Sequence, residues 1–122
     1  MIEQKKAEKD APGWITPTLL NGWAAFNADV YPSARFYKDS MGIVHLDGII
    51  AGGVVTGGSN IFVLPIGYRP KSRMLVTVPV SLSESPFYAE AHLIISFSGV
   101  IQIYNCPGNL YLSLSNISFL GE

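Results

Sequence analysis

The sequence predicts an all-β domain, an antiparallel β-sandwich or barrel, and three observations lead to this fold class. From Trp14 onward, short runs rich in β-branched and aromatic residues alternate with turns of Gly, Pro, Asn and Ser. None of these runs keeps the 3.6-residue period of an amphipathic helix. The length of 122 residues suits one domain with a single core.

The strands follow from the hydrophobic runs, taken in order along the chain. We expect strands at about residues 14–19, 23–27, 34–38, 43–51, 61–63, 73–81, 89–97, 100–105 and 111–119. The connections between them are typical turn sequences, such as the glycine-rich stretch 52–60 and the stretch 64–71 with its two prolines. No helix is expected after Asp10.

The first ten residues differ from the rest of the chain. They are polar and charged and suit a short helix, which Pro12 and Gly13 would end. We expect residues 1–13 to be a helical or disordered stem or linker segment, and residues 14–122 to be one β-barrel domain. A frayed terminus and the end of a coiled-coil stalk both fit this segment, because it is shorter than two heptads.

One hairpin is predicted in detail, around the turn at residues 39–42. Gly42 supplies the left-handed residue of a three-residue loop with a bulge. The register then places three pairs face to face: Phe36 with Leu46, Arg35 with Asp47, and Tyr37 with His45. The first pair is apolar and faces the core, whereas the four residues of the other two pairs form a polar strip on the opposite face. A shift by one residue would mix the two faces.

A second hairpin is predicted at Ser98-Gly99, between two apolar runs. Leu93, Ile95 and Phe97 would share one face, and Ile94 would lie on the other. A strand that is apolar on both faces belongs deep in a sandwich or against another subunit.

The charge distribution limits the classes of function. Of eight basic and nine acidic residues, three of each lie in residues 1–10, so five basic and six acidic residues remain in the other 112 positions. That is about 10% charge, against roughly 25% in typical soluble domains. Either the surface consists of neutral polar groups, or much of it is buried against copies of the chain. The net charge of −1 speaks against partners such as nucleic acid or anionic membranes.

Targeting and redox signals are few. The start of the chain has no apolar stretch typical of a signal peptide, and no run approaches the ~20 apolar residues of a membrane-spanning helix, so we expect no membrane insertion. Cys106, the single cysteine, allows no internal disulfide and no cysteine-based zinc site.

Catalytic motifs are also scarce. The chain has two histidines and no nucleophile-elbow, phosphate-loop or His-x-x-x-His pattern. Asp29, Asp47, Glu84 and Glu90 offer carboxylates for a glycosidase-like pair, but solvated carboxylates are the more common explanation. We therefore expect no enzyme, no catalytic residue, no cofactor and no metal site.

Binding of a neutral saccharide fits the residues better. Aromatic faces stack on the C–H surfaces of sugars, and planar polar groups bond their hydroxyls. The polar strip supplies both kinds of group, so the candidate ligand-binding residues are its members Arg35, Tyr37, His45 and Asp47, with Trp23 as a further aromatic contact. The alternative is that the strip only stabilises the sheet through cross-strand pairs, each worth about 0.2–1 kcal/mol.

Four segments together resemble a known family. They are Trp-Ile-Thr-Pro-Thr-Leu-Leu-Asn-Gly-Trp at 14–23, the hairpin segment 35–48, Leu-Pro-Ile-Gly-Tyr-Arg-Pro at 64–70, and the terminal run 111–119. In this order they look like the C-terminal receptor-binding (head) domains of tail-fibre and baseplate proteins from phages of Gram-positive hosts.

The resemblance implies a homotrimeric β-barrel or jelly-roll head at the end of a fibre in the phage tail, made in the cytoplasm of the host bacterium. It implies binding to cell-surface saccharides, either cell-wall polysaccharide or teichoic acid, and contacts with other baseplate or tail proteins through the N-terminal side. Linked weak sites would raise avidity by ~10²–10⁴. The alternatives are a structural trimerisation module without glycan binding, a polysaccharide depolymerase, and a secreted trimeric ligand of the tumour-necrosis-factor type.

Overall fold

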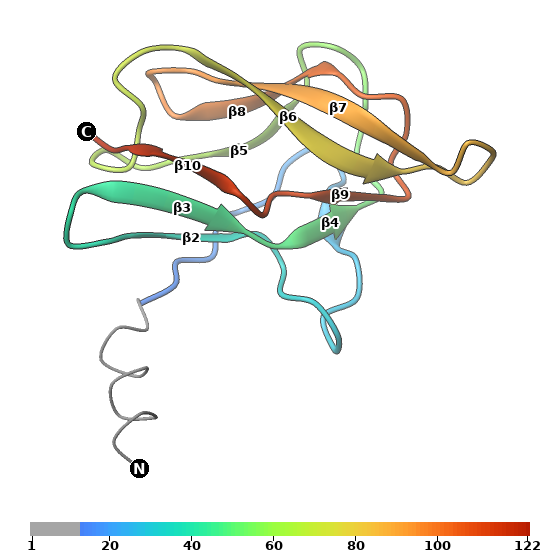
Figure 1. Ribbon diagram of the computed structural model, residues 1–122, viewed down its shortest axis with the longest axis horizontal. Helices are drawn as coiled ribbons and strands as arrows, with labels where there is room; N and C mark the ends of the chain where they lie inside the picture. The colour runs from blue at the N-terminus through green and yellow to red at the C-terminus, as the bar shows by residue number, and fades with distance from the viewer. Residues whose placement is uncertain (1–12) are drawn as a thin grey trace.

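The computed structural model describes residues 13–122, which form strands, turns and loops without a helix (Figure 1). The strands are β1 (Ala24–Ala25), β2 (Arg35–Lys38), β3 (Ile43–Asp47), β4 (Ile49–Ala51), β5 (Asn60–Val63), β6 (Met74–Ser81), β7 (Tyr88–Ile95), β8 (Val100–Asn105), β9 (Tyr111–Ser113) and β10 (Ile117–Leu120). The predicted all-β class is confirmed. Within the described part of the chain, no apolar helix is present that would cross a membrane. The stem expected at residues 1–13 lies, up to residue 12, outside the described residues.

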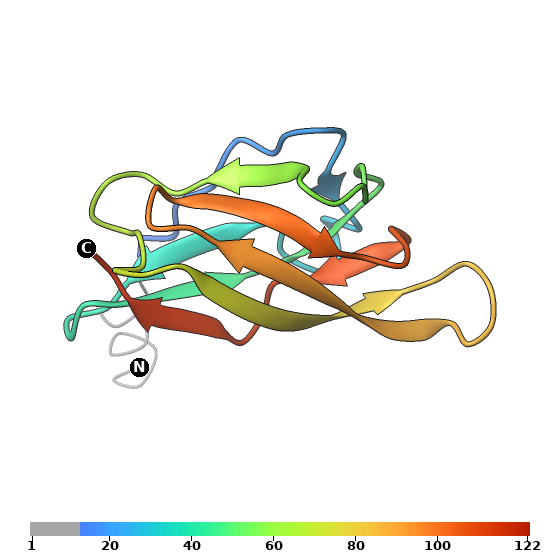
Figure 2. The same cartoon turned by 90° about the horizontal axis from the view of Figure 1, so that it is seen from above.

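The strands form two antiparallel sheets that enclose one core. The larger sheet has the order β1-β4-β9-β6-β7-β8-β5, and the smaller has the order β10-β3-β2. In Figures 1 and 2 the strands β6, β7 and β8 lie over the smaller sheet, and the larger sheet curls so that β4 and β9 continue the line of β3 and β10. Side chains such as Phe36, Phe62 and Leu93, each at most 1% exposed, fill the space between the layers.

Two of the expected strands are each divided into two, which the sequence analysis did not foresee. The run 43–51 breaks at Gly48, whose φ is +115°, and the run 111–119 breaks near Asn116, whose φ is +72°. At these corners β3 leads into β4 and β9 leads into β10, so each run passes from one sheet to the other. The amide of Leu114 donates to the carbonyl of Gly48 at 2.8 Å and ties the two corners together.

The expected strand at 14–19 is wrong as well. Only Ile15 pairs there, through two backbone hydrogen bonds with Phe36 of 2.8 and 2.9 Å. Pro17 has no N–H and cannot continue the ladder. The run 23–27 likewise shortens to the two residues of β1.

The first predicted hairpin is confirmed with its register. The three pairs named above face each other across β2 and β3. Gly42 has φ +85°, and its amide donates to the carbonyl of Asp39 at 3.0 Å. The Asp39 carboxylate accepts the amides of Met41 and Ile43, both at 2.9 Å, so the turn is held by its own side chain.

The second hairpin is confirmed too, with one correction. Gly99 has φ +89° in the turn between β7 and β8, and its amide donates to the carbonyl of Ser96 at 2.9 Å. Leu93 and Ile95 share the buried face as expected. Phe97 does not join them, because β7 ends at Ile95 and the Phe97 side chain, in the turn, is 69% exposed.

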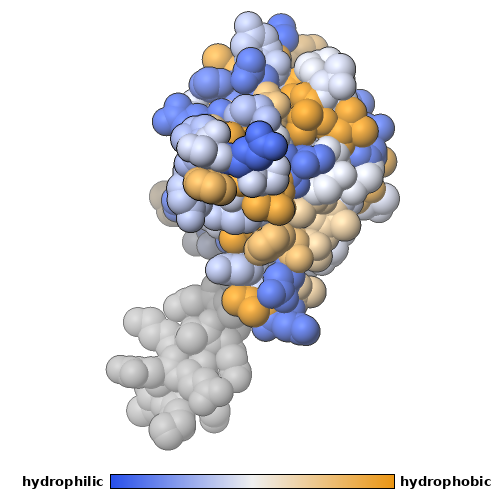
Figure 3. Space-filling model, turned by 90° about the vertical axis from the view of Figure 1, so that its right-hand side faces the viewer, coloured by the Kyte–Doolittle hydropathy of each residue, from blue (hydrophilic) through white to orange (hydrophobic). Residues whose placement is uncertain are grey.

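Several large hydrophobic side chains are exposed outside the core. Figure 3 looks onto the end of the molecule where the turn between β6 and β7 lies, and hydrophobic residues gather there beside hydrophilic ones. Phe87 and Tyr88 in this region are 53% and 72% exposed. Exposed aromatic residues close together are typical of binding surfaces.

Candidate functional site

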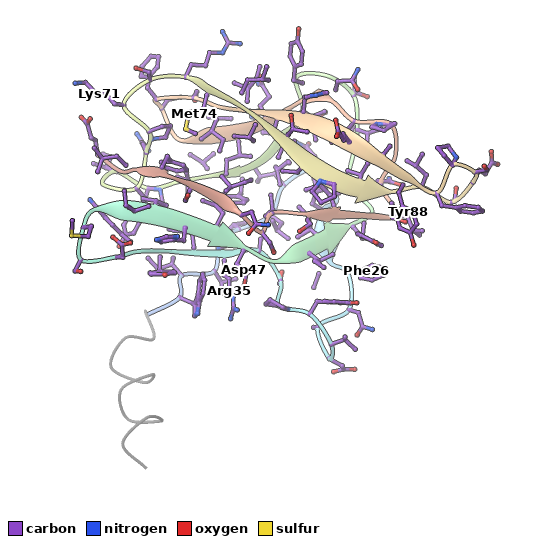
Figure 4. The ribbon with its side chains drawn as sticks, in the orientation of Figure 1. Phe26, Arg35, Asp47, Lys71, Met74 and Tyr88 are labelled. Carbon is purple, nitrogen blue, oxygen red and sulfur yellow. The ribbon has the colours of Figure 1, made fainter. Side chains whose placement is uncertain are left out.

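The polar strip lies on the outer face of the three-stranded sheet. Period-2 alternation along β2 and β3 buries Phe36, Val44 and Leu46 and leaves the strip residues half-buried. Figure 4 shows Arg35 and Asp47 next to each other on the outer side of this sheet. The fold therefore brings together four of the five residues that the sequence predicts as ligand-binding.

Arg35 and Asp47 form an ion pair. Nε and Nη2 of Arg35 donate to Oδ2 of Asp47 at 3.0 and 2.8 Å, and the hydroxyl of Ser115 donates to Oδ1 at 2.9 Å. Burial raises the pKa of the Asp47 carboxyl, but the hydrogen bonds from Arg35, Ser115 and the Gly48 backbone outweigh burial and leave the pKa below its usual value. Both oxygens of the carboxylate are thus held in place.

Tyr37 and His45 form the second pair of the strip. Their rings stack with centroids 4.8 Å apart and an interplanar angle of 18°. Nε2 of His45 lies 2.8 Å from Oδ2 of Asp39. The hydrogen bond to His45 is the main cause that lowers the pKa of the Asp39 carboxyl, and the Ile43 amide adds to it. Asp39 therefore fixes both the turn and the His45 ring.

Trp14 extends the strip, although the sequence analysis did not place it in the site. Its ring meets Tyr37 edge-on at a centroid distance of 4.7 Å, and Cζ of Arg35 lies 4.0 Å from the centre of the Trp14 ring. The backbone pair between Ile15 and Phe36 fixes Trp14 beside β2. The alternation of adjacent side chains carried the signal, because the half-buried Ile15 packs against the core and its neighbour Trp14 then lies on the face that the strip occupies.

Ser115 is the other residue that the sequence analysis missed. It lies at the corner between β9 and β10, 68 positions from its partner Asp47. No local pattern marks such a contact, because it depends on the strand passing from one sheet to the other.

Trp23 does not join the strip. Its side chain is 4% exposed and belongs to the core, where its ring fills the space next to Gly53. Its indole Nε1 is buried and has no hydrogen-bond partner among the described residues. A ligand at the surface does not reach this ring, so we leave Trp23 out of the candidate site.

The arrangement offers groups suited to binding a polar ligand. Trp14 and Tyr37 offer aromatic surface, and the ion pair beside them offers planar donors and acceptors, the combination that holds sugar rings. The Ser115 hydroxyl donates to Asp47 and not to His45, so the strip holds no Ser–His pair in the described part of the chain.

Comparison with known proteins gives one structural match. No family model matches the chain, and no curated protein matches it. The crystal structure of the receptor binding protein (gp15) of Listeria phage PSA superposes with a TM-score of 0.67 at 21% sequence identity, covering 99% of this chain and 73% of that chain. The chain therefore has the fold of a phage receptor-binding protein, the class that its sequence motifs resemble.

Proposed function

We propose that this protein is a receptor-binding domain of a phage tail, located in the virion at the tail tip or baseplate, which attaches to saccharides on the host cell surface. The similarity in fold to the Listeria phage receptor binding protein over 99% of the chain is the observation that carries this proposal. The neighbour is named as a binding protein, which fits a chain that is not an enzyme. Synthesis in the host cytoplasm is part of the same proposal.

The polar strip, extended by Trp14, is the proposed saccharide site. Its aromatic rings give a platform for the C–H face of a sugar. The ion pair and His45 supply donors and acceptors that are held in position before the ligand arrives, which lowers the entropy lost on binding. The ligand we propose is cell-wall polysaccharide or teichoic acid.

The experiment is a binding assay with the chain fused to a fluorescent protein. The fusion is expected to decorate Gram-positive host cells and to bind their purified wall polymer. Tyr37→Ala and Asp47→Ala are expected to reduce binding at least 10-fold, and Thr56→Ala, in an exposed loop, serves as the control. Unchanged binding by folded strip variants would remove the strip from the proposal.

We also propose that the domain works as a homotrimer. The outer face of β6, β7 and β8 is poor in charge, with Glu90 and His92 as the acidic and basic side chains among its outward positions. Leu75 and Tyr104 on this face are 63% and 61% exposed. Together with Ile94, Met74 and Arg73 they line a hollow of about 280 Å³. An apolar face of this kind is typical of a surface that a second copy covers.

A second candidate function is a structural fibre-tip module that binds no glycan. The observation in its favour is that the strip residues pair with one another, Arg35 with Asp47 and Tyr37 with His45, as they would in a stabilising cross-strand arrangement. Such a module would trimerise in the same way. It would leave cells undecorated in the assay above, whereas a depolymerase would release reducing ends from wall polymer.

A further inference from the structure

A second hollow lies at the end of the molecule formed by the turn between β6 and β7. Residues 82–85 of this turn and residues 107–110 of the loop between β8 and β9 enclose a volume of about 300 Å³. We call it the tip pocket. Figure 4 shows Tyr88, which begins β7, at the far end of the molecule from the N-terminal side and apart from Arg35 and Asp47. The tip pocket is therefore separate from the polar strip.

The walls of the tip pocket are fixed by contacts within the fold. Leu82 packs closely on Gly108, since a Cβ at Gly108 would come within 2.5 Å of Cδ2 of Leu82. Nδ2 of Asn109 donates to the carbonyl of Gly53 at 2.8 Å. In the turn, the amide of Phe87 donates to the carbonyl of Glu84 at 2.8 Å. The hollow is thus a shaped site and not a gap between loose loops.

The lining of the tip pocket selects against anions. Glu84 is the one charged side chain among the lining residues, and Ser83, Ser85 and Asn109 add neutral polar groups. A carboxylate accepts hydrogen bonds from hydroxyls, while serine and asparagine both donate and accept. No lysine or arginine lines the pocket to balance a phosphate. This set matches a ligand with many hydroxyls and no negative charge.

Phe87 gives an independent indication of binding beside the pocket. Its φ is +68°, a region that bulky side chains avoid, at a cost of about 1–3 kcal/mol. The side chain remains 53% exposed, so burial does not offset this strain. Its carbonyl accepts hydrogen bonds from the Leu82 amide at 2.7 Å and from the Ser81 hydroxyl at 3.2 Å, which hold it in place. The turn thus presents an aromatic ring to solvent at an energetic cost.

We propose that the tip pocket is a second saccharide-binding site, which takes a sugar ring that carries no negative charge. The Glu84 carboxylate accepts hydrogen bonds from the hydroxyls of the sugar, and the ring of Phe87 or Tyr88 packs on the C–H face of the sugar. This goes beyond the function proposed above, because it depends neither on the polar strip nor on a trimer. Two sites on one chain would also add to avidity on a polymeric ligand.

The test is a titration of the ¹⁵N-labelled chain followed by amide chemical shifts. The probes are glucose, galactose, rhamnose and N-acetylglucosamine, with glycerol 3-phosphate as the anionic comparison. We expect at least one of the sugars to shift the amides of residues 83–85 and 109–110 with a millimolar Kd. Glycerol 3-phosphate is expected to leave these amides unchanged. Absence of shifts with all four sugars, or equal shifts with the phosphate, would overturn the proposal.

Matched variants separate binding from structure. Glu84→Ala is expected to weaken the affinity for the sugar at least 10-fold. Glu90→Ala, which makes the same charge change on β7, is expected to leave this affinity unchanged. Phe87→Gly is expected to keep or raise the melting temperature, because glycine adopts a positive φ freely, and yet to weaken binding. Tyr37→Ala is expected to leave the sugar-induced shifts of the tip-pocket amides unchanged. Failure of the strip proposal is therefore distinguishable from failure of the tip-pocket proposal. Unchanged affinity in Glu84→Ala would contradict the tip site.

Discussion

At the scale of single residues, the ion pair of the strip contributes more to geometry than to stability. The side chains of Arg35 and Asp47 are 33% and 27% exposed. Pairs with this exposure are worth about 0–1 kcal/mol, because solvent screens the attraction. What the pair does is to hold a guanidinium over the Trp14 ring and a carboxylate in one orientation, as a polar ligand requires.

The first prediction concerns Asp47→Asn. The substitution keeps the size of the side chain but removes the charge that orients Arg35. We expect the free energy of unfolding in urea to fall by less than about 1 kcal/mol. Affinity for wall polymer, measured by calorimetry, is expected to fall at least 5-fold. A loss of stability without a loss of affinity would assign the pair to the structure alone.

The second prediction concerns acid stability. The pKa values of Asp39 and Asp47 are both lowered in the folded protein, so the unfolded chain binds more protons in acid. Their contribution is fully present above the unfolded value of about 3.9 and is lost as the pH falls through the lower folded values. We expect the melting temperature of the unmodified chain to drop below about pH 4. The drop should be shallower in the double variant Asp39→Asn, Asp47→Asn; identical profiles would contradict the stated pKa directions.

At the scale of elements, the corners decide how the two sheets are connected. β3 and β4 form one hydrophobic run in the sequence, and Gly48 turns it from the smaller sheet into the larger. A Cβ at this position would overlap the backbone of Ser33, and φ is +115°. The same corner places Asp47 next to Ser115, so the strip depends on it.

The third prediction compares Gly48→Ala with Gly58→Ala. Both glycines have positive φ, but a Cβ at Gly58 meets nothing within 4 Å. Gly58→Ala is expected to cost about 1–2 kcal/mol from its backbone conformation alone. Gly48→Ala adds the overlap with Ser33, and we expect at least about 3 kcal/mol. Urea denaturation of both variants measures the difference, and equal costs would show that the corner tolerates a side chain.

At the scale of the whole molecule, the low charge after residue 10 and the exposed apolar face of the larger sheet support the same proposal. Residues 13–122 leave both Leu75 and Tyr104 largely exposed, and a threefold assembly would bury them. Assembly would also bring three weak sites to one surface and raise avidity without new contacts.

The fourth prediction is the mass in solution. Three chains of 13.2 kDa give a particle of about 40 kDa, which light scattering at micromolar concentration measures. Leu75→Glu puts a charge into the proposed interface and is expected to yield the single chain. Val30→Glu, at a position 65% exposed in the loop before β2, is the matched control and should leave the mass unchanged. A monomer in the unmodified chain would end the trimer proposal, and weaker cell decoration by Leu75→Glu would link assembly to attachment.

The sequence by itself determined the local structure of this protein. Alternation of apolar and polar residues across 35–47, with Gly42 at the turn, specified the hairpin, its register and therefore the polar strip. These features depend on contacts between residues close in sequence, where the side-chain period of two allows one solution. The sequence motifs resemble phage receptor-binding domains, and the fold is similar to that of a phage receptor binding protein. The two agree because proteins that share a fold tend to share its turn and strand patterns.

Only the tertiary structure decided which distant residues meet. The sequence allows Trp23 either to contact a ligand at the surface or to pack in the core. In the structure its ring packs against Gly53 in the core. Ser115 reached Asp47, and the two loops closed the tip pocket, because strands pass between sheets at corners that a continuous hydrophobic run conceals. Burial and long-range pairing depend on how the layers stack, and hydrophobic periodicity along one strand carries no information about that.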